Sequence, residues 1–220
     1  MLWEDRGWPE CDLRKTQPGM QTNNVTDIHG LAEHHRTTLE IESHISPKVI
    51  GERGYRSVEE PDELSELGFA QYQSRCPALV VPVWGVDGQY RYARIRPDDP
   101  RQDRDNPKKV IKYEQPPGTP LALDVPRAAQ PHLADPTKRL WIVEGEKKAD
   151  ALVSRGECAV ALLGVWAWKR DGAPLEDWDH IRLIGREVRV LFDSDAAHKT
   201  EVKRALLALS AYLRGRMYGA

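Results

Sequence analysis

The chain has 220 residues, of which 40% are hydrophobic and 30% are charged, and its formal net charge is -2. This length suits one large domain or two small ones, and the near-neutral total neither indicates nor excludes a nucleic-acid partner, because a basic patch can be local. Three isolated cysteines, no apolar run near the roughly 20 residues of a membrane span and no signal-peptide core argue against a disulfide framework, a zinc ribbon and a membrane partner. We therefore expect a soluble cytoplasmic protein.

The first part of the chain carries no recognisable chemistry. Residues 1–26 mix tryptophan, proline and charge without a period, so we expect a poorly ordered tail. Residues 27–77 carry helix signals, such as the helix start at Ser46-Pro47, and we expect a small helical segment there. His34 and His35 fit no known zinc spacing, and we interpret them as scattered surface residues.

Residues 78–138 have the signals of a basic β subdomain. Ala78–Trp84 is apolar and β-branched, a turn follows at Asp87-Gly88, and Gln89–Arg96 alternates, which predicts a β-hairpin. Further along, four prolines make residues 119–138 a long extended connection, which we expect to mark the boundary of the subdomain.

A locally basic stretch, residues 91–112, is interleaved with tyrosines. Cations attract phosphates and aromatic rings stack on bases, so this stretch suits single-stranded nucleic acid. The residues that we assign to this binding are Arg91, Arg94, Arg96, Lys108, Lys109, Lys112 and Tyr113. The alternative is a solvated loop whose cations pair with the aspartates of the same stretch, and the residues alone do not decide between the two.

Residues 139–220 contain two apolar runs that each end in acid. Leu140–Val143 leads into Glu144-Gly145, and Val188–Phe192 leads into Asp193-Ser194-Asp195. Continuous apolar runs are typical of strands buried on both faces of a parallel sheet. Helical stretches follow both runs, and a third apolar run, Cys158–Leu163, lies between them. We expect an α/β domain with a mostly parallel sheet flanked by helices, preceded by the small α+β subdomain.

The acids that end these runs predict a metal site. In an open α/β sheet ligands bind just beyond the carboxyl ends of the strands, where Glu144, Asp193 and Asp195 would lie. Three carboxylates at one edge repel each other, and oxygen-only ligands favour Mg²⁺ or Mn²⁺, so we predict that these acids bind the metal and are catalytic. The lysines that we expect to bind the phosphates of a nucleotide are Lys147, Lys148 and Lys199. The alternative is that the acids cap the following helices, which does not account for the Asp-x-Asp pair.

The order of these motifs resembles the Toprim domain, the metal-binding fold of bacterial-type primases, topoisomerases and certain nucleases. Its signature is a strand that ends in Glu-Gly and a later strand that ends in Asp-x-Asp, here Glu144-Gly145 and Asp193-Ser194-Asp195. Upstream, Val81-Pro82-Val83 and Lys112-Tyr113 follow the order of the catalytic core of bacterial replicative primases. The pattern at Trp141–Leu152 is also similar to Toprim-like domains of unassigned function in phage and plasmid replication proteins.

This resemblance, which runs from about Ser46 to the C-terminus, implies Mg²⁺-dependent nucleotidyl transfer on single-stranded DNA, with nucleotides as substrates and a replicative helicase as a further partner. Two alternatives stay open: a Toprim-type nuclease, and a non-catalytic module that binds nucleic acid or docks in a replisome. Lys148 stands where many relatives carry an acid. Relatives also continue with another strand, so we expect a version that is truncated at its C-terminus.

Overall fold

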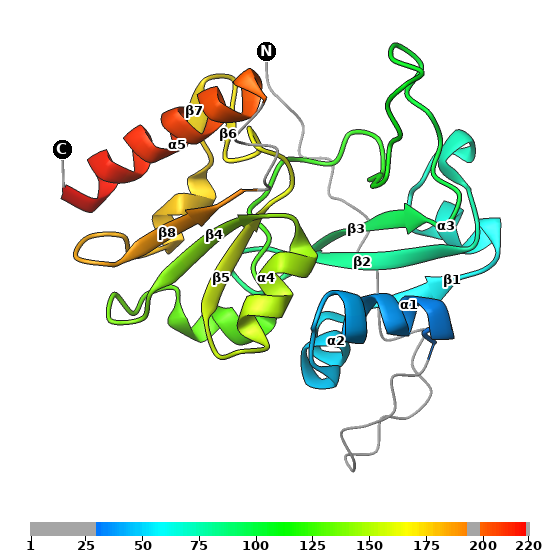
Figure 1. Cartoon of the computed structure of the whole chain (residues 1–220), viewed down its shortest axis with the longest axis horizontal. Helices are drawn as coiled ribbons and strands as arrows, with labels where there is room; N and C mark the ends of the chain where they lie inside the picture. Colours follow the sequence, from blue (N-terminus) through cyan, green and yellow to red (C-terminus); the bar gives the residue numbers. More distant parts are fainter. Residues whose placement is uncertain (1–29, 193–198, 219–220) are drawn as a thin grey trace, which may run out of the picture.

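The computed structural model describes residues 30–192 and 199–218 (Figure 1). The predicted tail, residues 1–26, lies outside this range, as do Asp193 and Asp195. Within it, the strands form an antiparallel three-stranded sheet, a parallel three-stranded sheet and a two-stranded hairpin. Of the helices in this part of the chain, none is long and apolar enough to cross a membrane.

The N-terminal segment is mainly helical, as predicted. Its helices are α1 (Glu33–Thr37), the π-helix η2 (Thr38–Glu42), α2 (Pro47–Arg53), α3 (Pro61–Glu66) and the 3-10 helix η3 (Gln71–Gln73). The start of α2 follows from its sequence, because the Ser46 hydroxyl accepts a hydrogen bond from the Val49 N–H (3.4 Å) and Pro47 needs no partner in the first turn. The helical prediction missed a strand, β1 (Arg56–Val58), because three residues are too few to show an alternating pattern.

The antiparallel sheet contains the predicted hairpin. Its strands lie in the order β1, β2 (Ala78–Trp84) and β3 (Tyr90–Pro97). On one face, Val80 and Ile95 lie in register and pack in a small core with Leu64 of α3. Side chains alternate along a strand, so Arg94 and Arg96 of β3 point to the opposite face.

Residues 119–138 differ from the predicted extended connection. They contain the 3-10 helix η4 (Arg127–His132), and Asp124 forms an antiparallel bridge with Ala161. The apolar side chains of this segment that are buried in the main hydrophobic core include Leu123, Val125, Ala129 and Leu133. The prolines prevent a regular strand, but the apolar residues between them pack against the protein, so the segment is part of the core rather than a linker.

The parallel sheet confirms the predicted α/β architecture. Its order is β5 (Cys158–Leu162), β4 (Leu140–Glu144) and β8 (Val188–Leu191), with β4 in the middle, and the helices are α4 (Glu146–Val153) and α5 (Thr200–Tyr218). Between β5 and β8 the chain forms β6 (Lys169–Arg170), β7 (Ala173–Pro174) and the 3-10 helix η5 (Glu176–His180). In Figure 1, α4 lies between the two larger sheets.

One strand is less buried than its sequence predicted. All five residues of β5 are buried, although this strand also lies at an edge of the parallel sheet, and the segment that contains Asp124 covers its outer side through the bridge to Ala161. In β8, however, half-buried and exposed residues alternate, and Leu191 is 45% exposed. The prediction that this run is buried on both faces is wrong, because β8 lies at an edge of the sheet and, unlike β5, has no strand or bridge on its outer side among the described residues.

A buried charge cluster joins three segments of the fold. Arg53 of α2 donates hydrogen bonds to the carboxylates of Asp124 (Nη1 to Oδ1, 2.8 Å) and Asp150 (Nη2 to Oδ1, 2.8 Å), and the Tyr55 hydroxyl donates to Asp150 (2.6 Å). Arg53 is 1% exposed and both aspartates are fully buried. Because these partners come from α2, the connection and α4, the cluster fixes the helical segment against the parallel sheet.

Candidate functional site

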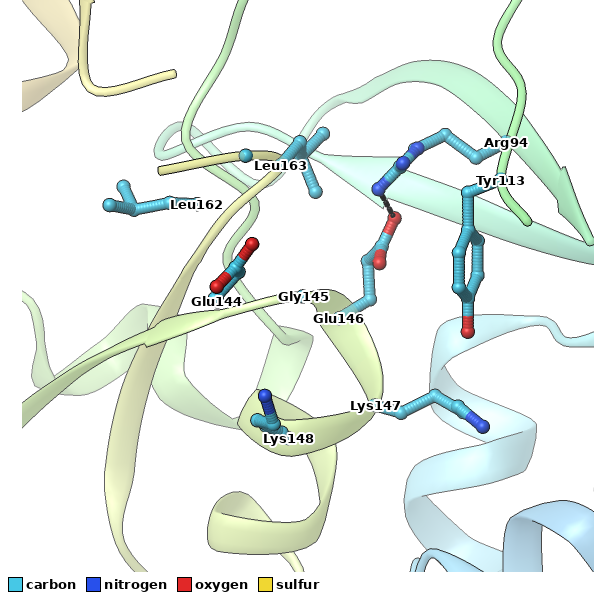
Figure 2. Close-up of a pocket in the computed structure, with 10 residues that line it drawn as sticks. Arg94, Tyr113, Glu144, Gly145, Glu146, Lys147, Lys148, Leu162 and Leu163 are labelled. Atoms are coloured by element: carbon cyan, nitrogen blue, oxygen red, sulfur yellow. Dashed lines mark hydrogen bonds and ion pairs between the residues drawn. The ribbon is translucent and has the colours of Figure 1, made fainter. Parts of the chain in front are cut away.

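A pocket with a volume of about 350 Å³ opens at the carboxyl end of β4 (Figure 2). It is lined by side chains from the β4–α4 turn, from the end of β5 and from the antiparallel sheet and the segment after it. These residues are Arg94, Tyr113, Glu144, Gly145, Glu146, Lys147, Lys148, Leu162, Leu163 and Gly164. The site therefore lies where ligands bind in parallel α/β sheets, and it is shared between the two sheets.

The turn from β4 into α4 depends on Gly145. This residue has φ 89° and ψ 147°, a region of backbone conformation that is essentially restricted to glycine. Its N–H donates a hydrogen bond to the Leu162 carbonyl of β5 (2.9 Å), so the turn stays attached to the sheet. The sharp change of direction places Glu144 at the last position of the strand and Glu146 at the first position of the helix.

Glu144 lies where the sequence predicted it, at the carboxyl edge of the sheet. It lines the pocket, and its positive neighbour Lys148 projects from the first turn of α4 toward the same space (Figure 2). The adjacent strand β8 pairs Leu191 with Val143, one residue before Glu144. Asp193 and Asp195 follow β8 in the sequence but lie outside the described residues, so the meeting of the three acids stays a prediction.

The sequence analysis missed Glu146, which is the most buried charged group in the pocket. Its carboxylate is 2% exposed and accepts a hydrogen bond from Arg94 Nη1 at 2.7 Å. The guanidinium of Arg94 also lies over the Tyr113 ring, 5.0 Å from its centroid. Figure 2 shows that Arg94 reaches from β3 toward the start of α4, so this ion pair connects the antiparallel sheet to α4 across the pocket.

Two of the three predicted phosphate-binding lysines line the pocket. Burial lowers the pKa of both Lys147 and Lys148, and for Lys147 the positive charge of Arg96 lowers the pKa further. A partly desolvated ammonium group gains from an anionic ligand such as a phosphate. The third, Lys199, precedes α5 on an exposed part of the chain and is not among the described residues that line the pocket.

The predicted basic stretch divides into two groups of residues. Arg94, Arg96 and Tyr113 lie at or beside the pocket, since Arg96 also lies over the Tyr113 ring (5.9 Å). The residues that lie outside it are Arg91, Lys108, Lys109 and Lys112. Among these, Arg91 pairs with Asp87 (3.0 Å) and Lys109 pairs with Asp103 (3.5 Å).

Lys109 therefore pairs within the stretch, which is the alternative left open by the sequence, whereas Arg91 pairs with an aspartate before the stretch and Lys108 and Lys112 are exposed. Whether the stretch binds nucleic acid stays a prediction.

Comparison with known sequences gives two partial matches. The profile of a domain of unknown function (DUF3854) matches residues 131–217, which include the parallel sheet and α5. The chain is also 33% identical to an uncharacterized protein of Picosynechococcus sp., in a match that covers 47% of this chain and 14% of that protein. The chain thus spans a small part of the length of this relative.

Comparison with solved structures relates the fold to DNA primases. The zinc-binding and RNA polymerase domains of the Aquifex aeolicus primase are similar with a TM-score of 0.57 and 14% identity, over 83% of this chain and 47% of that one. The primase fragment of the bacteriophage T7 primase-helicase protein matches with a TM-score of 0.45 and 17% identity, over 93% and 72%. The similarity to the Aquifex structure shows that the chain has a primase-like mixed α/β fold.

Proposed function

We propose that the chain is a primase-like Toprim protein that performs Mg²⁺-dependent nucleotidyl transfer on single-stranded DNA, in the replication of a mobile element. The observation that carries this proposal is the pocket itself: Glu144 lies at the carboxyl edge of the parallel sheet with Lys147, Lys148 and Arg94 around it. A carboxylate that can hold a metal, next to lysines that can attract phosphates, suits phosphoryl transfer. The primase-like fold is in agreement with this function.

The residues present fit a hard divalent cation. Glu144 supplies a carboxylate in the pocket, and the next strand of the sheet leads directly into Asp193 and Asp195. These three acids would hold Mg²⁺ or Mn²⁺ with oxygen ligands alone, which such cations prefer. When bound, the cation would supply charge stabilisation at the phosphoryl group that is transferred.

The other residues of the pocket bind and orient the substrate. Lys147 and Lys148 attract the phosphates of the incoming nucleotide, because their partly buried ammonium groups lack full hydration. The buried pair of Arg94 and Glu146 keeps β3 in contact with α4 and so fixes the width of the pocket. The exposed lysines Lys108 and Lys112 lie on the loop that follows β3, where they would contact the backbone of the template.

A primer-synthesis assay tests the proposal. The chain is incubated with a single-stranded DNA template, labelled nucleotides and Mg²⁺, and the products are separated by length. We expect short template-dependent products that are lost in Glu144→Gln and kept in Glu66→Gln, a matched change at an exposed residue of α3.

The same assay separates the alternatives. Degradation of the template without synthesis would identify a nuclease that uses the same acids. Salt-sensitive binding of DNA without either reaction would identify a non-catalytic module of a replisome. Co-purification with a helicase encoded beside the chain would then test the expected helicase partner.

A further inference from the structure

We propose that His34, His35 and Asp98 form a binding site for a transition metal of the zinc type, separate from the pocket at Glu144. The Nε2 atoms of His34 and His35 lie 2.8 and 2.9 Å from the two carboxylate oxygens of Asp98. One ligand atom from each residue can be chosen so that all three lie within 4.8 Å of one another. Two imidazoles and one carboxylate are a donor set that zinc uses in proteins.

The arrangement is not what two neighbouring helical residues adopt by default. Successive side chains on an α-helix point about 100° apart, because the helix has 3.6 residues per turn. Here both imidazoles nevertheless converge on one carboxylate, with ring centroids 4.0 Å apart. That carboxylate comes from Asp98, directly after the end of β3, so the fold brings together ligands that are 63 and 64 residues apart.

A second hydrogen bond holds His35 in a ligand-like orientation. Its ring is buried, and its Nδ1 lies 2.7 Å from the Ser57 hydroxyl, which in turn accepts a hydrogen bond from the Ala32 N–H (2.8 Å). Metal-bound histidines commonly use their other ring nitrogen in this way, which fixes the tautomer and the direction of the ring.

The geometry is close to that of a three-ligand zinc site. Zn–N bonds of about 2.0 Å in a tetrahedral site place neighbouring ligand atoms about 3.3 Å apart, so the two contacts would need to lengthen by about half an ångström. The side chain of His34 is 55% exposed, which leaves a path for the metal and a fourth position for water. The positive charge of Arg96 also acts on His35 and would weaken cation binding.

This site differs in chemistry and position from the proposed magnesium site. Imidazole ligands disfavour Mg²⁺, and Asp98, just past the end of β3, lies four residues beyond Arg94, about 13 Å along the extended chain. A metal bound here would join α1 to the end of β3, the strand that supplies Arg94 and Arg96 to the pocket region. The inferred role is structural.

Metal titration of the full chain tests the inference, with Co²⁺ as a spectroscopic probe and Zn²⁺ by calorimetry after chelator treatment. We expect one tight site for each ion, a rise in the melting temperature with Zn²⁺, and at least about tenfold weaker binding in His34→Asn and His35→Asn. His180→Asn, an exposed histidine in η5, is the matched control, and Glu144→Gln should also bind Zn²⁺ normally. A magnesium excess should not displace the Co²⁺.

The competing explanation is a hydrogen-bonded cluster that holds no metal. Two results would support this explanation and overturn the proposed metal site. In the first, the wild type binds neither Co²⁺ nor Zn²⁺ at one equivalent. In the second, both histidine variants bind these ions as tightly as the wild type. His34→Asn is the safer variant, because its side chain is largely exposed and the fold should not depend on it. Circular dichroism of each variant without metal verifies that it is folded.

Discussion

Glu146 is a buried carboxylate of the pocket whose charge is balanced by Arg94. It is 2% exposed, and the Arg94 side chain that neutralises it is 13% exposed. Removal of one partner from a buried ion pair leaves an uncompensated charge, which is strongly destabilising. The sequence predicted a basic strand at Arg94 and a helix start at Glu146, but not that the two side chains meet, because 52 residues separate them.

We predict that Arg94→Gln lowers the free energy of unfolding by about 3 kcal/mol, because Glu146 then stays buried without its cation. Urea denaturation at neutral pH measures this loss. Arg91→Gln on the same strand is the matched control: its pair with Asp87 is partly exposed, so the change should be at most about 1 kcal/mol. Equal losses of unfolding free energy in the two variants would mean that the buried Arg94–Glu146 pair contributes no more to stability than the partly exposed Arg91–Asp87 pair.

At the scale of elements, the strand-to-helix turn at Gly145 is the feature that positions the site. The sequence predicted the end of β4, the tight turn and the start of α4, because an apolar run, a glycine and a helix-forming run follow each other directly. It could not predict β1, because three residues are too few to show an alternating pattern. Nor could it predict that residues 119–138 pack into the core, because the prolines interrupt the spacing of their apolar residues.

Gly145→Ala should destabilise the protein by about 1–3 kcal/mol, because φ 89° with ψ 147° is strained for any residue with a side chain. If the pocket binds nucleotides as proposed, the same change should weaken that binding, since Glu144 and Lys148 flank the turn. Gly215→Ala is the matched control, as this glycine lies inside α5 with no atom within 4 Å of an added Cβ, and the change should stabilise by about 0.5–1 kcal/mol. Calorimetric melting of both variants compares them, and a neutral effect at Gly145 would contradict the strained turn.

The loop after β3 gives a second test at this scale, which rests on the proposed function. Lys108, Lys109 and Lys112 are exposed. If all three contact phosphates of single-stranded DNA, the triple change to Gln should make the plot of log binding constant against log salt concentration less steep by about 2. Fluorescence anisotropy with a labelled oligonucleotide measures the slope. An unchanged slope would show that these lysines are part of a solvated loop.

At the scale of the whole molecule, the cluster of Arg53, Asp124 and Asp150 holds the helical segment to the parallel sheet. One guanidinium faces two buried carboxylates. Burial and the negative charge of Asp124 raise the pKa of Asp150 to about 6, although the positive charge of Arg53 opposes this shift. No sequence pattern indicated the cluster, because its members are 71 and 97 residues apart and each is unremarkable alone.

The raised pKa predicts a pH dependence of stability. The folded protein retains a proton on Asp150 up to a pH of about 6, whereas the unfolded chain releases it near the ordinary pKa of 3.8. The stability that this proton contributes is therefore fully present below pH 3.8 and is lost as the pH rises through about 6. The wild type should therefore lose stability relative to Asp150→Asn between about pH 4 and pH 7. The measurement is the free energy of unfolding of both proteins at each pH. The exposed Asp105→Asn should show no such trend, and a flat difference for Asp150→Asn would contradict the assignment.

The proposed function depends on Glu144 and the Asp-x-Asp pair after β8 holding one hard cation beside the pocket. Titration with Mn²⁺, followed by electron paramagnetic resonance of the free ion, tests it most directly. We expect Mn²⁺ to bind, and we expect Glu144→Gln, Asp193→Asn and Asp195→Asn each to weaken this binding at least about tenfold, while Asp98→Asn leaves it unchanged. Mn²⁺ binding that is absent, or that survives all three substitutions, would contradict it.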